Sequence, residues 1–271
     1  METNLLRRVR LILRAFDGCS PAALRLLIKR GPKAGRKIVG ATLRQAVCLE
    51  TKYLMNWLDL LTIFSVDEDL VLSGESWCEG STSPLERVLL AQLIRFFKPK
   101  TILELGTYRG STTRLLLDNM PPDGTIYTVD LPPEGDFSNI PGVTDMQMIA
   151  LRAPSQGYEK HARARNVKQV LGNTFDPSLW ARIPEGIEFA FIDASHSYEA
   201  VKNDTEWVHR KAVKDAVLVW HDYMANAAPE NGVGRFIREQ MRDCNDIFVC
   251  SDTTMAIRIP TRFLGDGTRC T

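Results

Sequence analysis

The chain has 271 residues, of which 44% are hydrophobic and 25% are charged, and its formal net charge is +1. These fractions are those of a globular protein and exclude a disordered or fibrous chain. No apolar run approaches the length of about 20 residues that a membrane-spanning helix needs, and arginines interrupt the apolar N-terminus, so neither a membrane span nor a signal peptide is expected.

The first part of the chain is basic and has the pattern of helices. Residues 1–52 carry twelve lysines and arginines against three acidic residues, a net charge of +9 that leaves −8 for the remaining chain. Apolar periodicity and Gly/Pro breaks predict helices over 5–16, 21–30 and 36–64, followed by a loop over 65–84.

This basic segment has three candidate roles. It could pack on the acidic body or mediate a homodimer, which we favour, or it could lie on an anionic membrane surface. It lacks the interleaved aromatic residues of a single-strand nucleic-acid platform, so we expect no nucleic-acid partner.

From residue 84 onward, helical and strand-like segments alternate. Strands are predicted over 101–105, 125–130, 167–171, 187–193, 216–220, 247–251 and 255–259. Helices are predicted over 85–97, 111–120, 155–165, 177–183, 198–213 and 233–244.

The alternation defines the fold class. The inner strands are short and apolar on both faces, which predicts an α/β, doubly wound, mostly parallel sheet covered by helices. Only residues 252–254 separate the last two of the seven strands, so these two must form an antiparallel hairpin. The expected organisation is a basic helical N-terminal extension over 1–83, a ligand-binding domain over 84–260 and a C-terminal tail over 261–271.

The cysteines indicate the compartment. None of the six forms a C-x-x-C pair, so zinc-ribbon and thioredoxin-like sites are not supported. Reduced thiols in a cytoplasmic protein are expected, with the inner membrane surface as the alternative location.

A glycine-containing loop follows the first strand of this domain and opens a helix. Its glycines allow a sharp turn and a close approach to a ligand, and the helix N-terminus supplies free N–H donors. An acid twenty residues beyond Gly110, Asp130, ends the next strand, where it could accept the hydroxyls of a ribose. The candidate cofactor residues in the loop are Glu104, Gly106, Thr107, Tyr108, Gly110, Ser111 and Thr112.

The spacing of the glycines in this loop restricts the class of ligand that it could bind. It reads E-x-G-x-x-x-G rather than the dinucleotide G-x-G-x-x-G, and it has no P-loop lysine. A ligand without a pyrophosphate and with a cationic head, such as S-adenosylmethionine, suits it. The alternative is a tight strand-to-helix turn with no ligand.

Acidic and imidazole side chains follow the fourth and fifth strands of the domain. Asp193 ends one strand, and His221 and Asp222 end the next. Ligands of open α/β sheets bind beyond the carboxyl ends of the strands, so these three should converge beside Gly106 and could hold a divalent cation such as Mg²⁺. The alternative is that the two acids cap helices or bind the cofactor directly.

His196 lies three residues beyond Asp193, at the mouth of the same crevice. An imidazole titrates near neutral pH and could act as the general base, while a metal would lower the pKa of a bound hydroxyl. The alternative is a structural hydrogen bond to Asp193 or a helix cap.

The stretches ILELGTYRGSTT, IYTVD, FAFIDASHSYEAVKNDTEWV and LVWHDY resemble class I S-adenosylmethionine-dependent methyltransferases. Within that class they are similar to the metal-dependent, catechol O-methyltransferase-like branch, including bacterial antibiotic-tailoring and sugar O-methyltransferases. The resemblance covers roughly residues 81–260. It departs at His221, where the branch usually has an acid or the Asp of an Asp-Asn pair.

The resemblance implies roles for individual residues. Asp193, with His221 and Asp222, would hold the metal, and His196 would lie beside the acceptor hydroxyl. Asn173 and Thr174 would lie near the adenine. The implied activity is O-methylation of a small molecule or sugar; the alternatives are an NAD(P)-dependent oxidoreductase and a non-catalytic binding protein on the same fold. The acceptor pocket is expected from Trp77, Tyr223 and the loops at 132–153 and 224–232.

Overall fold

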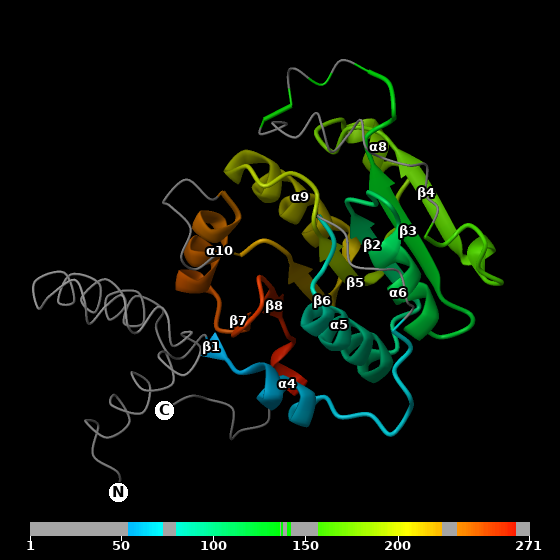
Figure 1. The fold of residues 1–271 in the computed structure, drawn as a ribbon. Helices are drawn as coiled ribbons and strands as arrows, with labels where there is room; N and C mark the ends of the chain where they lie inside the picture. The colour runs from blue at the N-terminus through cyan, green and yellow to red at the C-terminus, as the bar shows by residue number, and fades with distance from the viewer. Residues whose placement is uncertain are drawn as a thin grey trace, which may run out of the picture. The chain divides into compact units, whose positions relative to one another are not determined.

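The computed structural model describes residues 54–72, 80–135, 137, 140–141, 157–223 and 232–263 (Figure 1). The basic segment 1–52 and its predicted helices lie outside the described residues, apart from the end of the third helix, as does most of the predicted tail at 261–271.

Eight strands form one sheet in the order β1-β7-β8-β6-β5-β2-β3-β4. They are β1 (Leu54–Met55), β2 (Thr101–Leu105), β3 (Thr125–Asp130), β4 (Val167–Leu171), β5 (Ile187–Ile192), β6 (Ala212–Trp220), β7 (Ile247–Cys250) and β8 (Ala256–Arg258). The helices are α4 (Trp57–Ile63), α5 (Pro84–Phe97), α6 (Ser111–Asn119), α8 (Pro177–Trp180), α9 (Tyr198–Lys211) and α10 (Gly232–Asp243), with short 3-10 turns at Ala164–Asn166 and Thr261–Phe263.

The predicted fold class is confirmed. Strands β4, β3, β2, β5 and β6 pair in parallel, and β8 pairs antiparallel with both β6 and β7. The strand order reverses between β2 and β5, which places the carboxyl ends of these two strands at the switch point where α/β sheets bind ligands.

The strand that the sequence did not predict is β1. It shows that the helix predicted over residues 36–64 is wrong at residues 54–55. Leu54 and Met55 pair in parallel with Val249 and Cys250 of β7, and helix α4 begins only at Trp57. The side chain of Asn56 accepts a hydrogen bond from the Leu58 N–H at 2.8 Å and so caps the helix. The apolar pattern runs through both elements, so periodicity alone did not separate the strand from the helix.

The helix predicted over residues 155–165 is also wrong within the described residues. Residues 157–163 form turns, and only a 3-10 turn, Ala164–Asn166, follows. The ring of Tyr158 packs against Gly110, and the Gly157 N–H bonds to the Arg109 carbonyl at 3.2 Å. Tertiary contacts to the loop after β2 therefore replace local helix formation.

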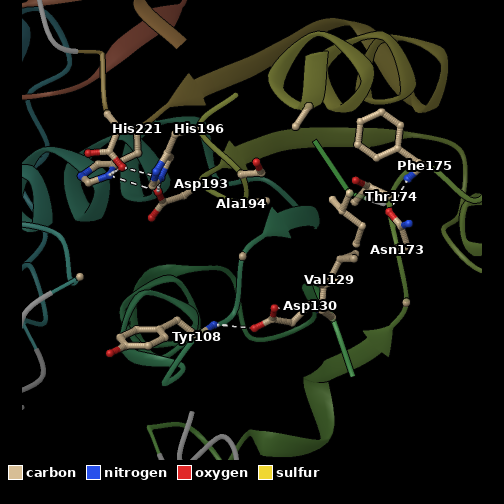
Figure 2. Close-up of a pocket in the computed structure, with 18 of the residues that line it drawn as sticks. Tyr108, Val129, Asp130, Asn173, Thr174, Phe175, Asp193, Ala194, His196 and His221 are labelled. Carbon is tan, nitrogen blue, oxygen red and sulfur yellow. Dashed lines mark hydrogen bonds and ion pairs between the residues drawn. The ribbon is translucent and has the colours of Figure 1, made fainter. Parts of the chain in front are cut away.

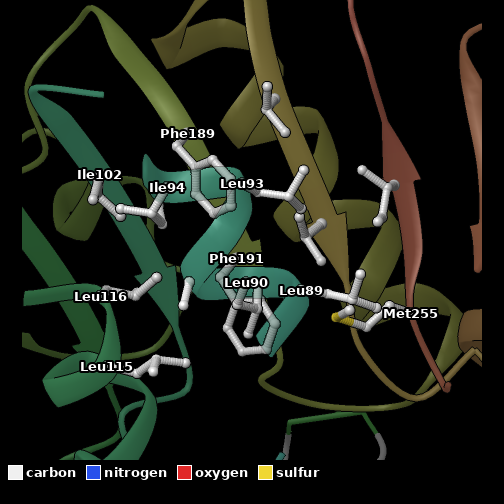
Figure 3. Packing of buried hydrophobic residues seen from close by; sticks show 14 of the residues in the cluster. Leu89, Leu90, Leu93, Ile94, Ile102, Leu115, Leu116, Phe189, Phe191 and Met255 are labelled. Atoms are coloured by element: carbon white, nitrogen blue, oxygen red, sulfur yellow. The ribbon is translucent and has the colours of Figure 1, made fainter. Parts of the chain in front are cut away.

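Alternation along the strands divides the core between two faces. Phe189 and Phe191 of β5 pack with α4, α5 and α6, together with Ile102 of β2 and Leu116 of α6 (Figure 3). The intervening residue, Ala190, is equally buried on the opposite face, where α9 covers β5 and β6. A sheet covered on both faces is rigid, and it fixes where its strand ends place their side chains.

Among the described residues, the structure contains no helix that is both long enough and apolar enough to span a bilayer. Cys244 and Cys250 both carry free thiols.

Candidate active site

A cavity of about 350 Å³ opens at the carboxyl ends of β2, β3, β5 and β6 (Figure 2). It holds nine of the predicted site residues: Gly106, Tyr108, Asp130, Asn173, Thr174, Asp193, His196, His221 and Asp222. Other residues complete its wall: Gly80, Ser81, Val129, Leu131, Ile140, Gly172, Phe175, Ala194, Ser195 and Ala200.

The loop after β2 approaches β5 very closely at Gly106. This residue has a φ of +97°, and a methyl group added there would lie 2.0 Å from the Asp193 carbonyl oxygen. The Gly106 N–H also bonds to the Val129 carbonyl at 2.9 Å, which ties the loop to β3. Only glycine satisfies both the conformation and the contact.

The carboxylate of Asp130 is held by backbone donors. Its Oδ2 accepts the Tyr108 N–H at 2.8 Å (Figure 2), and its Oδ1 accepts the Leu131 N–H at the same distance. Tyr108 has a φ of +48°, a left-handed conformation that turns its N–H toward this acid. The carboxylate lines the cavity, where it can accept hydrogen bonds from ligand hydroxyls.

Glu104 does not line the cavity. It is 0% exposed, and its Oε2 accepts hydrogen bonds from the hydroxyls of Thr113 and Thr128, both at 2.5 Å. Burial raises the pKa of Glu104 to about 8, against the lowering effect of these two hydroxyls. The structure thus places the acid beneath the loop, where it connects β2 to α6 and β3.

Four further loop residues also lie outside the cavity wall. The Thr107 hydroxyl bonds with the Thr128 hydroxyl at 2.6 Å, and Gly110, at a φ of +73°, precedes α6. The Ser111 hydroxyl accepts a hydrogen bond from Arg87 at 2.9 Å, and Thr112 lies in the first turn of α6. These residues shape the loop rather than its ligand-facing surface.

At the other end of the cavity, Asn173 and Thr174 follow β4. The Thr174 carbonyl accepts hydrogen bonds from the Trp180 indole at 2.8 Å and from the Asn203 amide at 3.0 Å. The Asn173 side chain closes a turn with the Phe175 N–H at 3.0 Å. This segment is therefore fixed before any ligand binds.

Asp204 of α9 is a buried acid that lies beneath this segment. Its carboxyl should make the stability of the fold depend on pH. Burial raises the pKa of Asp204 to about 6, against hydrogen bonds from Thr174 and Asn203 that lower it. The unfolded value is 3.8, so the folded state loses stability as pH rises through this window. We expect Asp204→Asn to remove about 2 kcal/mol of this pH dependence between about pH 4 and 7, measured by urea unfolding.

Asp176, the N-cap of α8, is a control with the opposite sign. It is exposed, and the Ser178 N–H lowers the pKa of its carboxyl. Asp176→Asn should therefore lose stability relative to the parent as pH rises. If Asp204→Asn follows the parent curve at every pH, the assignment of a buried, neutral acid is wrong.

The second cluster gathers around two carboxylates. Asp193 extends from β5, and His221 and Asp222 follow β6, as predicted. The Nδ1 of His221 lies 3.2 Å from Asp193 Oδ1 and 3.3 Å from Asp222 Oδ2. The three side chains thus converge beside the Gly106 loop.

His196 joins the same cluster from the loop after β5. Its Nε2 lies 2.8 Å from Asp222 Oδ2. The same nitrogen lies 3.9 Å from Asp193 Oδ1 (Figure 2). The side chain of His196 is 46% exposed, whereas that of His221 is 11% exposed. His196 is therefore the more accessible of the two histidines that line the cavity.

The carboxylates control the charge of both imidazoles. The contacts with Asp193 and Asp222 raise the pKa of His196 to about 10. Burial alone would lower the pKa of His221, but the charge of Asp193 and contacts with Asp222 and Glu86 raise it. At Asp222, burial raises the pKa of the carboxyl, but the two histidines lower it, and the net pKa is below the usual value.

The donor set fits a divalent cation. His221 Nδ1 is buried and has no hydrogen-bond partner among the described residues, although two carboxylate oxygens lie near it. Neighbouring ligands of an octahedral ion about 2.1 Å away are about 3 Å apart, close to these separations. Asp193, His196 and Asp222 also offer ligand atoms within 4.8 Å of one another.

Two groups of lining residues were not predicted. Leu131 and Gly172 directly follow β3 and β4, so their positions at strand ends could have identified them. Ser81 comes from an irregular segment with no periodic signal, whereas Ile140 belongs to the loop at 132–153 that was expected to contribute to the acceptor pocket. In contrast, Tyr223 is 2% exposed and does not line the cavity, and Trp77 lies outside the described residues.

Comparison with known proteins agrees with this geometry. Residues 103–223 match the family described as "Methyltransferase domain". An uncharacterized protein of Acanthamoeba polyphaga mimivirus is 25% identical over 149 residues, which cover 53% of this chain and 62% of the viral protein, less than two thirds of its length.

Solved structures are similar in fold. The SAH-bound Podospora anserina methyltransferase PaMTH1 has a TM-score of 0.52 at 16% identity, covering 67% of this chain and 80% of that one. The O-methyltransferase TomG of Streptomyces achromogenes, in complex with SAM, has a TM-score of 0.46 at 20% identity, covering 66% and 82%.

The family match spans β2 to the end of the His221–Tyr223 segment, which includes the glycine loop, Asp130 and the acid–imidazole cluster. Residues 103–223 of the chain are thus similar to a methyltransferase domain.

Proposed function

We propose that the protein transfers a methyl group to a hydroxyl oxygen of a small molecule or sugar, with the help of a divalent cation. One observation carries the proposal: the same cavity has a hydroxyl-accepting carboxylate, Asp130, toward one side and the acid–imidazole cluster of His196, Asp193 and Asp222 toward the other. The first suits a nucleoside, and the second suits activation of an oxygen nucleophile.

The donor side of the cavity would hold S-adenosylmethionine, which supplies an already activated methyl group. Asp130 would accept the ribose hydroxyls, as an acid at the end of this strand does in related nucleotide-binding folds. Asn173 and Thr174 would flank the adenine, in the segment fixed by Trp180. The close approach at Gly106 would leave room for the methionine portion beside the Tyr108 backbone.

The acceptor side would prepare the oxygen. His196 is exposed toward the cavity. A cation on Asp193 and Asp222 would neutralise the carboxylates that raise its pKa, so the deprotonated ring would take the proton of the acceptor hydroxyl as general base. Asp222, 2.8 Å from its Nε2, would orient the ring and stabilise the imidazolium that forms. The rigid strand ends would align the nucleophile, since orientation accounts for much of such a rate enhancement.

Asp193, His221 and Asp222 would hold the cation, leaving His196 free to act as base. The cation would supply Lewis acidity that lowers the pKa of the acceptor hydroxyl. Asp222 would remain ionised under it, in keeping with the lowered pKa of its carboxyl.

The competing functions are an NAD(P)-dependent oxidoreductase and a non-catalytic binding protein. S-adenosylhomocysteine at a hundred times its dissociation constant should stabilise the fold by about 2.7 kcal/mol, and NAD should not. Stabilisation by NAD instead would contradict the proposal, as measured by thermal unfolding with each ligand and with neither.

Methyl transfer is the direct test. With labelled S-adenosylmethionine, a screen of sugar, phenol and amine acceptors should give product with at least one hydroxyl-bearing class, and a chelator should suppress it. Product from amines alone would contradict O-methylation. Activity that is unchanged by the chelator would remove the cation from the mechanism and leave the methyltransferase assignment intact.

A further inference from the structure

Glu86 is a buried acid outside every motif of the site. It is the third residue of α5 and is 3% exposed. Its Oε2 accepts the Ser83 N–H at 2.7 Å, and its Oε1 accepts both the N–H and the hydroxyl of Thr254 at 2.8 Å. These bonds fix the carboxylate between the start of α5 and the turn between β7 and β8.

The same carboxylate also contacts His221, on the ring nitrogen that does not face the two acids of the site. Glu86 Oε2 lies 3.3 Å from His221 Nε2, on the opposite side of the ring from Asp193 and Asp222. A carboxylate only accepts hydrogen bonds, so Nε2 must carry the proton in this contact. With Nε2 as the donor to Glu86, Nδ1 is the nitrogen that faces the two acids, where a bound cation would take the place of a proton.

We propose that Glu86 is the positioning residue that makes His221 an Nδ1 ligand, and that the resulting set of one imidazole and two carboxylates selects a transition ion such as Co²⁺ or Zn²⁺ over Mg²⁺. The inference rests on the proposed cation site. It adds which ion the site prefers and which residue orients the His221 ligand.

The physical basis has two parts. A hydrogen bond to the outer nitrogen of a ligating histidine fixes its tautomer and ring orientation, and losing it typically costs 10- to 100-fold in metal affinity. Imidazole suits Zn²⁺ and similar ions, whereas Mg²⁺ prefers an all-oxygen set. The buried Nδ1 without a hydrogen-bond partner is the structural feature that both parts explain.

The test measures cation binding by the full chain rather than activity. Isothermal titration with CoCl₂ should show a Glu86→Gln affinity about 10- to 100-fold below the parent. The glutamine NH₂ must face either His221 or Thr254, both of which donate. Thr254→Val is the matched control: it removes one donor to Glu86 but keeps the His221 contact, so its Co²⁺ affinity should stay close to that of the parent.

Two further readouts separate positioning from folding. In the zinc-loaded parent, a long-range ¹H–¹⁵N spectrum should show His221 with a protonated Nε2 and a metal-bound Nδ1. His221→Asn replaces the nitrogen by an amide oxygen and should weaken Co²⁺ binding more than Mg²⁺ binding. In that background, Glu86→Gln should have little additional effect on Co²⁺ affinity.

The outcomes are distinguishable. Unchanged Co²⁺ affinity in Glu86→Gln, a zinc-bound Nε2, or an equal loss of both ions in His221→Asn would overturn the inference. A parent that binds none of these ions would also overturn the cation part of the proposed function, while methyl transfer in the same preparation would retain the rest.

Discussion

Replacing His196 by alanine is expected to lower the turnover number by about 10²- to 10⁴-fold, the usual contribution of a general base. The side chain is half exposed, faces the cavity and is held 2.8 Å from Asp222 Oδ2. Because it makes no hydrogen bond to the β2–α6 loop or to Asp130, the affinity for S-adenosylhomocysteine should not change. Single-turnover methyl transfer and equilibrium binding of the product measure the two effects separately.

His209 provides the matched control. It is an exposed histidine on α9, outside the cavity wall, so His209→Ala should keep the parental turnover number. His196→Ala should also keep Co²⁺ affinity if His221 is the imidazole ligand. A His196→Ala enzyme with parental turnover would remove the base from the mechanism; one that has lost Co²⁺ binding would make His196 a ligand instead.

Gly106→Ala is expected to have the largest effect on the fold around the site. The new methyl group would lie 2.0 Å from the Asp193 carbonyl oxygen, a backbone atom that cannot yield without moving β5. Left-handed strain and overpacking together should cost about 3 to 5 kcal/mol of unfolding free energy. Displacement of the loop should also weaken S-adenosylhomocysteine binding by about 100-fold or more.

Gly186→Ala separates the left-handed backbone strain from the overpacking. Gly186 has a similar φ of +86°, but no atom lies within 4 Å of an added methyl group. This variant carries only the conformational cost, about 1 kcal/mol, and should bind S-adenosylhomocysteine like the parent. Equal losses of stability in the two variants, measured by chemical denaturation, would show that contact with Asp193 is not the reason for glycine at 106.

Parts of the site could be predicted because strand ends are predictable. Short apolar runs located β2, β3, β5 and β6, and parallel strands place their carboxyl ends at one edge, so Asp130, Asp193 and Asp222 had to come near one another. The same reasoning did not distinguish ligand-facing residues from supporting ones. Glu104 belongs to the glycine motif, yet its side chain points into the core toward Thr113 and Thr128.

The wrong secondary-structure predictions share one cause. Residues 157–163 were predicted as a helix from local pattern, but their contacts with Gly110 and Arg109 determine their conformation. Strand β1 forms only because β7 offers an unpaired edge to Leu54 and Met55. In each case a partner distant in sequence decides the local structure, and a single sequence does not show that partner.

The sequence by itself determined the doubly wound sheet, the glycine loop and the acids at the strand ends, because periodicity and turn chemistry are local properties. Only the tertiary structure decided which face of His221 meets Asp193 and which meets Glu86, a residue 135 positions earlier in the chain. Contacts of that kind depend on how α5 and the β7–β8 turn pack against the end of β6. Packing of side chains from separate elements leaves no periodic signal in the sequence.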